Sequence, residues 1–139
     1  MDRFRVAVLG ACAGVVEWPA KVAAAIYAGL DFAAGDPTAA KLLASGAFDS
    51  EEATQRRYWD TVGKLTDQMR EGSPKPDAVP RSADEASLAG VTAIAANRIR
   101  TERPDQLSAI APELVQLVLL PHLGFEAARE WAERTKRHL

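Results

Sequence analysis

The stretch RVAVLGACAGVV, residues 5–16, decides between two folds for this chain. A short apolar run that leads into glycines is typical of the first strand and phosphate loop of a nucleotide-binding fold. That loop needs G-x-G-x-x-G, because the backbone must close on a pyrophosphate. Here Ala-Cys-Ala separates Gly10 from Gly14, and the lysine of a P-loop is missing. We therefore predict a helix, whose apolar stripe comprises Phe4, Val8, Ala11 and Val15.

The remainder of the chain carries helix signals and no further strand pattern. No run rich in Val, Ile, Thr and aromatic residues follows residue 16, so a parallel sheet has no other strands to draw on. Alanine-rich segments with helical periodicity follow instead, separated by prolines and glycines. The expected helices cover residues 19–34, 37–45, 50–70, 82–103, 107–120 and 125–136. With the opening helix, this predicts an all-α fold of about six to seven helices.

Short motifs predict several helix boundaries. Asp49 with Glu52, and Ser82 with Glu85, have the spacing of capping boxes at helix starts. The run GSPKPD, residues 72–77, predicts the one long loop. A proline at position 121 is expected to kink or break the apolar helix that precedes it.

Length and composition fit a single globular domain, residues 1–139. The chain is 47% hydrophobic and 26% charged with a net charge of −2, so it has no general basic excess for nucleic acid. The single cysteine, Cys12, rules out an internal disulfide and suits a reducing compartment. The longest uncharged runs hold about a dozen residues, short of the ~18–20 that span a bilayer. We expect a cytoplasmic protein that engages no membrane.

The segment of residues 107–120 is apolar almost all round. A domain of this size covers one side of such a helix, so a second copy of the chain is expected to cover the other. Small residues on the preceding helix would let helices approach closely. The expected dimer interface comprises Ala89, Ala93, Ala96, Leu114, Leu117, Val118, Pro121, His122 and Phe125. The alternative for each of these residues is the ordinary core of one chain.

Three segments together resemble the effector domain of the tetracycline-repressor (TetR) family of bacterial transcriptional regulators. The first is EWPAKVAAAIYAGLDFAAGDPTAAKLLASGAF, residues 17–48, with a W-P helix start and a D-P turn. The second, SADEASLAGVTAIAANRI at residues 82–99, is similar to the penultimate helix of that family. The third, PELVQLVLLPHLGFEAAREWA at residues 112–132, is similar to its last helix. The resemblance extends over about residues 6–132.

The resemblance implies two activities for the chain. The first is dimerisation, with the last two long helices forming a four-helix bundle across a two-fold axis. The second is the binding of a small, mostly apolar effector among the earlier helices, which controls DNA affinity allosterically. The family reads DNA with an N-terminal helix-turn-helix module that these residues lack. This chain is thus expected to contain no DNA-binding domain and to reach DNA only through a missing N-terminal domain of a repressor.

Effector pockets are apolar cavities with a few polar groups that orient the ligand. The candidate ligand-binding residues are Tyr27, Tyr58, Trp59 and Met69 for the walls, and Cys12, Thr66, Thr92 and Asn97 for polar contacts. The alternative is that the aromatic side chains and Met69 are plain core and that Asn97 faces water.

Neither an enzyme nor a cofactor or metal protein is expected. The G-x-S-x-G motif is absent, and the chain has two histidines, His122 and His138, without metal-ligand spacing. We expect His122 to be a core or interface residue. The basic cluster of Arg98, Arg100 and Arg103 is explained by the negative end of its helix dipole. The alternative function is a free-standing helical dimer that binds or sequesters a small hydrophobic molecule or a partner protein.

Overall fold

The computed structural model describes residues 2–101 and 104–136, and all regular structure within them is helical. The seven α-helices are α1 (Asp2–Cys12), α2 (Trp18–Gly35), α3 (Pro37–Ser45), α4 (Glu52–Arg70), α5 (Arg81–Thr101), α6 (Ala111–Leu123) and α7 (Phe125–Arg134). Two 3-10 helices, η1 (Gly46–Phe48) and η2 (Pro104–Ile110), complete the described part. The predicted all-α fold is confirmed.

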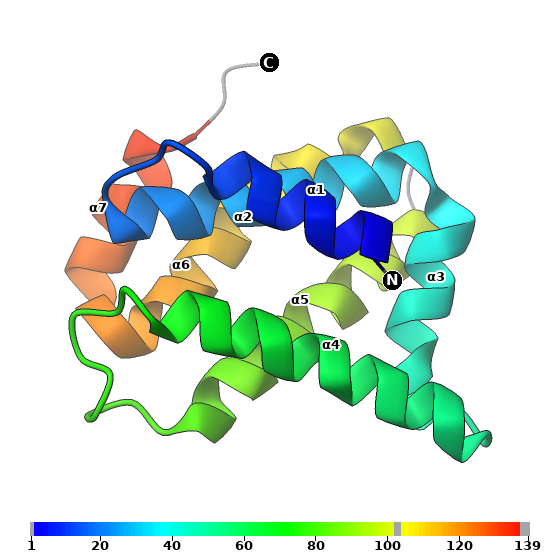
Figure 1. Ribbon diagram of the computed structural model, residues 1–139. Coiled ribbons are helices and arrows are strands. Elements are labelled where there is room, and N and C mark those ends of the chain that lie inside the picture. Colours follow the sequence, from blue (N-terminus) through cyan, green and yellow to red (C-terminus); the bar gives the residue numbers. More distant parts are fainter. Residues whose placement is uncertain (1, 102–103, 137–139) are drawn as a thin grey trace.

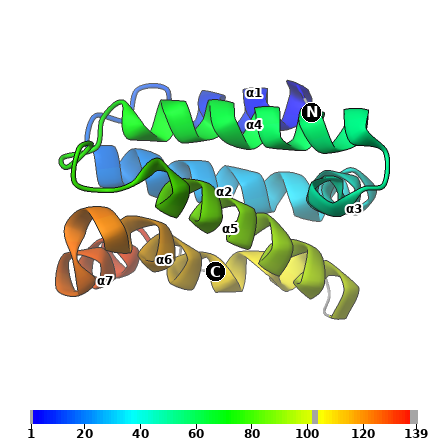
Figure 2. The same cartoon turned by 90° about the horizontal axis from the view of Figure 1, so that it is seen from below.

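Helix α2 crosses the molecule behind α1 in Figure 1 and forms the middle layer in Figure 2. Helices α1 and α4 lie on one side of it, and α6 and α7 lie on the other (Figure 2). Helix α5 crosses between the two sides and packs against α3, α4 and α6. The main core forms where the apolar faces of α2 and α6 meet, and its innermost members include Ala23, Leu30, Val115, Val118 and Leu119. This arrangement leaves α1 and α4 as two walls above α2.

The opening helix is shorter than predicted. Helix α1 ends at Cys12, and Gly14 adopts a φ of 80°, a conformation that terminates the helix and that side chains other than glycine rarely adopt. Val15 therefore lies outside the helix, and Ala11 is exposed. The predicted stripe of four residues is correct only for Phe4 and Val8, which face α2.

The predicted helix at residues 37–45 is confirmed as α3. Pro37 opens it, where its missing N–H costs no bond. Asp36 caps it by accepting a hydrogen bond from the Ala39 N–H at 3.1 Å. That bond, reinforced by a hydrogen bond from Arg3, lowers the pKa of Asp36 below its ordinary value.

Both predicted capping boxes are wrong. The Asp49 carboxylate accepts from the Glu51 N–H at 2.8 Å, in the turn before α4, so it does not cap the helix. Helix α5 begins at Arg81, one residue before Ser82, and Glu85 binds the Arg81 side chain at 3.0 Å. The Asp49 carboxylate is thus bonded to the Glu51 N–H, and the Glu85 carboxylate to the Arg81 side chain, instead of to the backbone groups that the capping boxes would use.

The apolar segment near the C-terminus also differs from the prediction. The part before Ala111 is 3-10 helix, and α6 continues through Pro121 without a break until Gly124, whose φ of 84° ends it. Pro121 lies on the exposed side of α6, where water can satisfy the carbonyl that loses its partner. Phe125 is 58% exposed, because it starts α7 on the outer side, whereas Ala128 of the same helix is buried.

Candidate ligand-binding cavity

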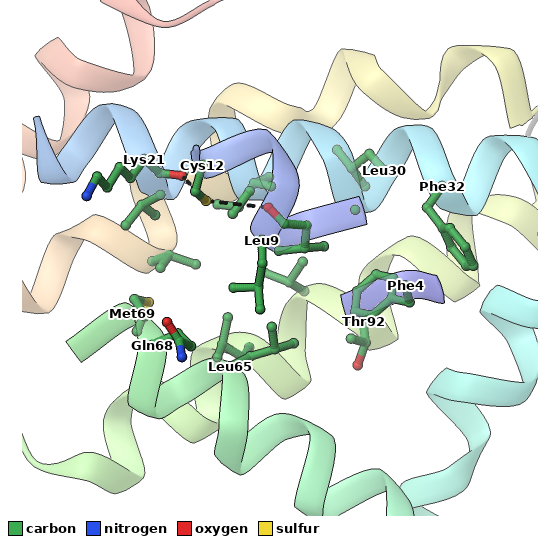
Figure 3. Close-up of a pocket in the computed structure, with 18 of the residues that line it drawn as sticks. Phe4, Leu9, Cys12, Lys21, Leu30, Phe32, Leu65, Gln68, Met69 and Thr92 are labelled. Carbon is green, nitrogen blue, oxygen red and sulfur yellow. Dashed lines mark hydrogen bonds between the residues drawn. The ribbon is translucent and has the colours of Figure 1, made fainter. Parts of the chain in front are cut away.

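A cavity of about 510 Å³ lies between α1, α2, α4 and α5 (Figure 3). Its walls are mostly aliphatic. They are supplied by Phe4, Val8, Leu9, Val22, Ile26, Leu30, Val62, Leu65, Leu88 and Val91, among others. One residue of α6, Val118, also reaches it. The volume is within the roughly 300–1,000 Å³ that small-molecule sites occupy.

Small residues on the inner faces of two helices create this space. On α2, Ala25, Gly29 and Ala33 follow one another at intervals of four and so share one face of the helix. On α5, Ala95 and Ala96 line the opposite wall. Since larger side chains at these positions would fill the space, the cavity is built into the sequence of α2 and α5.

The polar groups inside the cavity already have partners. The Thr92 hydroxyl lies 3.0 Å from the Tyr58 hydroxyl and 2.8 Å from the Ala89 carbonyl oxygen. The Cys12 Sγ lies 3.4 Å from the carbonyl oxygens of both Val8 and Lys21. Burial raises the pKa of the Cys12 thiol, an effect that the charge of Lys21 partly offsets. The Cys12 thiol therefore lines the cavity as a neutral group with little hydrogen-bonding capacity to offer a ligand.

Trp18 lines one end of the cavity. Its indole N–H donates to the Met69 carbonyl at 2.6 Å, which ties the start of α2 to the end of α4. Its ring lies 4.9 Å from the ring of His122, centroid to centroid. Gly72 approaches the indole so closely that a Cβ there would lie 2.6 Å from Trp18 Cδ1.

This contact gives a stability prediction. We expect Gly72→Ala to lower the free energy of unfolding by about 1–3 kcal/mol, because the indole is held on both sides and cannot move aside freely. The control is Gly10→Ala, at a helical glycine where a Cβ would meet nothing within 4 Å; it should leave stability unchanged or slightly raised. Urea denaturation measures the free energy of unfolding of the two variants. Equal free energies would contradict the close packing of Gly72 on Trp18.

Behind Trp18, four side chains form a buried polar chain. Ser73 Oγ lies 2.6 Å from His122 Nδ1, His122 Nε2 lies 2.7 Å from Asp84 Oδ1, and Arg70 donates to Asp84 Oδ2 at 2.6 Å. His122 and Asp84 have no exposed surface. Arg70 also donates to the carbonyl oxygens of Pro76 and Val79. The chain thus fastens the loop between α4 and α5 to α5 and α6.

The order Ser73–His122–Asp84 matches that of a catalytic triad. Because the Asp84 carboxylate can only accept, His122 Nε2 donates to it, and His122 Nδ1 lies within hydrogen-bond distance of the Ser73 hydroxyl. However, Ser73 is not among the residues that line the cavity, and Arg70 holds the second carboxylate oxygen. The geometry therefore supports a structural fastening for the loop, in line with the expectation that His122 is a core residue.

Three of the eight predicted ligand-binding residues line the cavity: Cys12, Met69 and Thr92. The other five do not. Tyr27 and Tyr58 are buried in the core, where the Tyr58 hydroxyl is held by Thr92. Thr66 is fully buried and donates to the Val62 carbonyl.

Trp59 and Asn97 also lie elsewhere. Trp59 is exposed on the outer side of α4 and packs edge-to-face on Tyr58. Asn97 is exposed and lines a separate shallow groove between α5 and α6. Helix periodicity turns both side chains away from the cavity.

The predicted dimer interface divides into two faces. Leu114, Val118 and His122 are buried within the chain's own core, so in a single chain they present almost no surface to a partner. Leu117, Pro121 and Phe125 are exposed, as is Ala93 on α5. Ala89 is half-buried, and the half-buried Ala96 lines the cavity. One side of α6 therefore packs inward, and the other side remains apolar and uncovered in a single chain.

Sequence reasoning missed most of the cavity. The walls supplied by α1 (Phe4, Leu9) and by Trp18 were not candidates, nor was the polar chain through Asp84. The signal that could have found the cavity is the four-residue spacing of small residues on the inner face of α2.

Within the described residues, no group of three or more His, Cys, Asp or Glu side chains is arranged to hold a metal ion. Arg98 and Arg100 lie in the last turn of α5, and Arg103 lies outside the described residues. By length and composition alone, Gln106–Leu123 would suffice to cross a membrane, and 44% of this stretch is buried in the fold. The core helix of a soluble protein passes the same test.

Comparisons of the chain with protein-family models, with curated proteins and with solved structures found no match.

Proposed function

We propose that this chain is the effector-sensing and dimerisation domain of a TetR-like transcriptional repressor. It binds a small apolar ligand, and ligand binding controls an N-terminal helix-turn-helix domain outside this chain. The observation that carries the proposal is the cavity of about 510 Å³ with aliphatic walls between α1, α2, α4 and α5. Monomer cores are close-packed, so a void of this size is expected where a ligand binds.

The uncovered face of α6 supports the dimer. Leu120 and Pro121 follow Leu117 by three and four residues and so share one exposed side of α6 with it; Phe125, at the start of α7, is also exposed. Beside them, Ala93 and Asn97 of α5 line a shallow groove together with Leu117. A two-fold axis along this groove would cover the apolar face with the same face of a second chain.

Helix α6 links the two activities. Val118 touches the cavity on one side of α6, while Leu117 and Pro121 face outward on the other. A ligand that displaces α6 by a small distance therefore acts directly on the dimer face. This supports allostery through the relative orientation of the two chains.

The test is uptake of an apolar probe by the purified chain. We expect calorimetric titration with decanol or adamantanol to show one site per chain. The change Ala96→Leu narrows the cavity and should abolish uptake, whereas Ala86→Leu, the same change on an exposed position of α5, should not. A folded wild-type chain that takes up neither alcohol would contradict the proposal.

A further inference from the structure

The cavity is graded in polarity from one end to the other. Its walls are largely aliphatic, lined by Val8, Ile26, Leu88 and Val91 among others, and Leu9 and Leu65 lie between the two ends in Figure 3. Two hydrogen-bonding groups of the lining, Thr92 near Phe4 and Cys12 near Lys21 (Figure 3), already have protein partners. A ligand with polar groups along its body would lose its hydrogen bonds to water and gain none.

Two aromatic rings line the end of the cavity near the start of α1 and the end of α2. Phe4 and Phe32 meet edge to face with their ring centroids 5.4 Å apart. Behind them, Arg3 lies over the Phe32 ring and pairs with Asp36 at 3.0 Å. Arg3 is thereby engaged outside the cavity lining, and among the described residues no charged side chain lines this end.

The opposite end carries the polar side chains. Lys21, Gln68 and Glu71 line the cavity there, beside Trp18, and all three side chains are exposed. Figure 3 shows Lys21 and Gln68 at the end away from Phe4 and Phe32. One positive group, one negative group and one amide leave this rim without net charge, yet with both donors and acceptors.

The cavity is long. Its lining on α2 extends from Trp18 to Ala33, which is roughly 22 Å at about 1.5 Å per residue. An extended molecule follows such a path, whereas a compact ring system of equal volume would contact only part of the walls.

We propose that the cavity takes a slender aliphatic molecule with one small polar head of no net charge, its tail toward Phe4 and Phe32 and its head at Lys21, Gln68 and Glu71. This inference rests on the proposed function and names the ligand class for the same cavity.

The test compares matched ligands on the wild-type chain by calorimetry. Decanol and adamantanol have the same number of carbons and one hydroxyl each, and we expect decanol to bind more tightly. From hexanol through octanol to decanol, affinity should rise about fourfold per added CH₂. If adamantanol binds and the linear alcohols do not, the slender shape of the ligand is wrong while the proposed function stands. If neither binds, the proposed function itself fails.

Ligands with charged head groups test whether the head binds beside Lys21, Gln68 and Glu71. Decanoic acid and decylamine should bind more weakly than decanol to the wild-type chain. Glu71→Gln leaves Lys21 in excess and should raise the affinity for decanoic acid about two- to fivefold, and Lys21→Gln should do the same for decylamine. Both residues are exposed, so the variants should fold as the wild type does. Unchanged head preference in both variants would overturn the placement of the head at this rim.

Discussion

Asp84→Ala should be among the most destabilising substitutions in the chain, with an expected loss of about 3–5 kcal/mol in the free energy of unfolding. The carboxylate has no exposed surface and holds Arg70 on one oxygen and His122 on the other. Removing it leaves a largely buried guanidinium without its partner and an imidazole N–H without an acceptor. For a domain whose total stability is of the order of 5–15 kcal/mol, such a loss is a large fraction.

The matched control is Asp67→Ala. Asp67 also binds an arginine, Arg81, but its side chain is 64% exposed. We expect this variant to unfold at nearly the wild-type urea concentration, because solvent screens the pair. Should Asp84→Ala fail to fold, Asp84→Asn keeps the shape and one acceptor and should give a measurable, smaller loss. Similar urea midpoints for the Asp84 and Asp67 variants would show that the hydrogen-bonded side chains around Asp84 stabilise the fold no more than an exposed ion pair does.

Val118→Asp should destabilise the fold, whereas Leu117→Asp, at the neighbouring residue, should leave the fold intact and disrupt the proposed dimer. Val118 has no exposed surface, so an aspartate there adds an unpaired buried charge and removes a packed side chain. We expect a loss of about 4 kcal/mol or more in the free energy of unfolding. Leu117 is 39% exposed, and an aspartate there should leave the fold intact and separate the proposed dimer.

Light scattering measures the mass of each variant, and urea denaturation measures its stability. The wild-type chain should have twice the 15.0 kDa mass of one chain, and Leu117→Asp should have the mass of one chain with the wild-type helix content. A stably folded Val118→Asp chain would contradict the core packing of α6. A wild-type monomer, or a Leu117→Asp dimer, would contradict the assigned dimer face.

The order of helices could be predicted from the sequence because prolines and glycines clearly mark where helices start and end. Proline at the start of α3 and the glycine- and proline-rich loop after α4 act through backbone geometry alone, which needs no knowledge of the fold. The capping boxes failed because Asp49 and Glu85 have competing donors close by, the Glu51 N–H and the Arg81 side chain. Spacing alone does not rank such competitors.

The candidate site was predicted less well, for a physical reason. Large aromatic residues such as Tyr27 and Tyr58 were chosen as walls, yet large side chains fill space and so end in the core. Empty space arises where small residues coincide, as at Gly29 on α2 and Ala96 on α5, and that coincidence depends on tertiary packing. Which side of α6 packs inward likewise depends on how α2 lies against it, and Val118 belongs to the core that the two helices share.

Trp18 gives the chain an optical signal of its own. The indole lines the cavity beside the proposed head group and is fixed against His122, so its emission depends on whether water or a ligand lies next to it. The other tryptophans differ: Trp59 is exposed, and Trp131 lies under the Arg134 guanidinium at 4.4 Å. With those two replaced by phenylalanine, the remaining fluorophore would report occupancy of the cavity without any added dye.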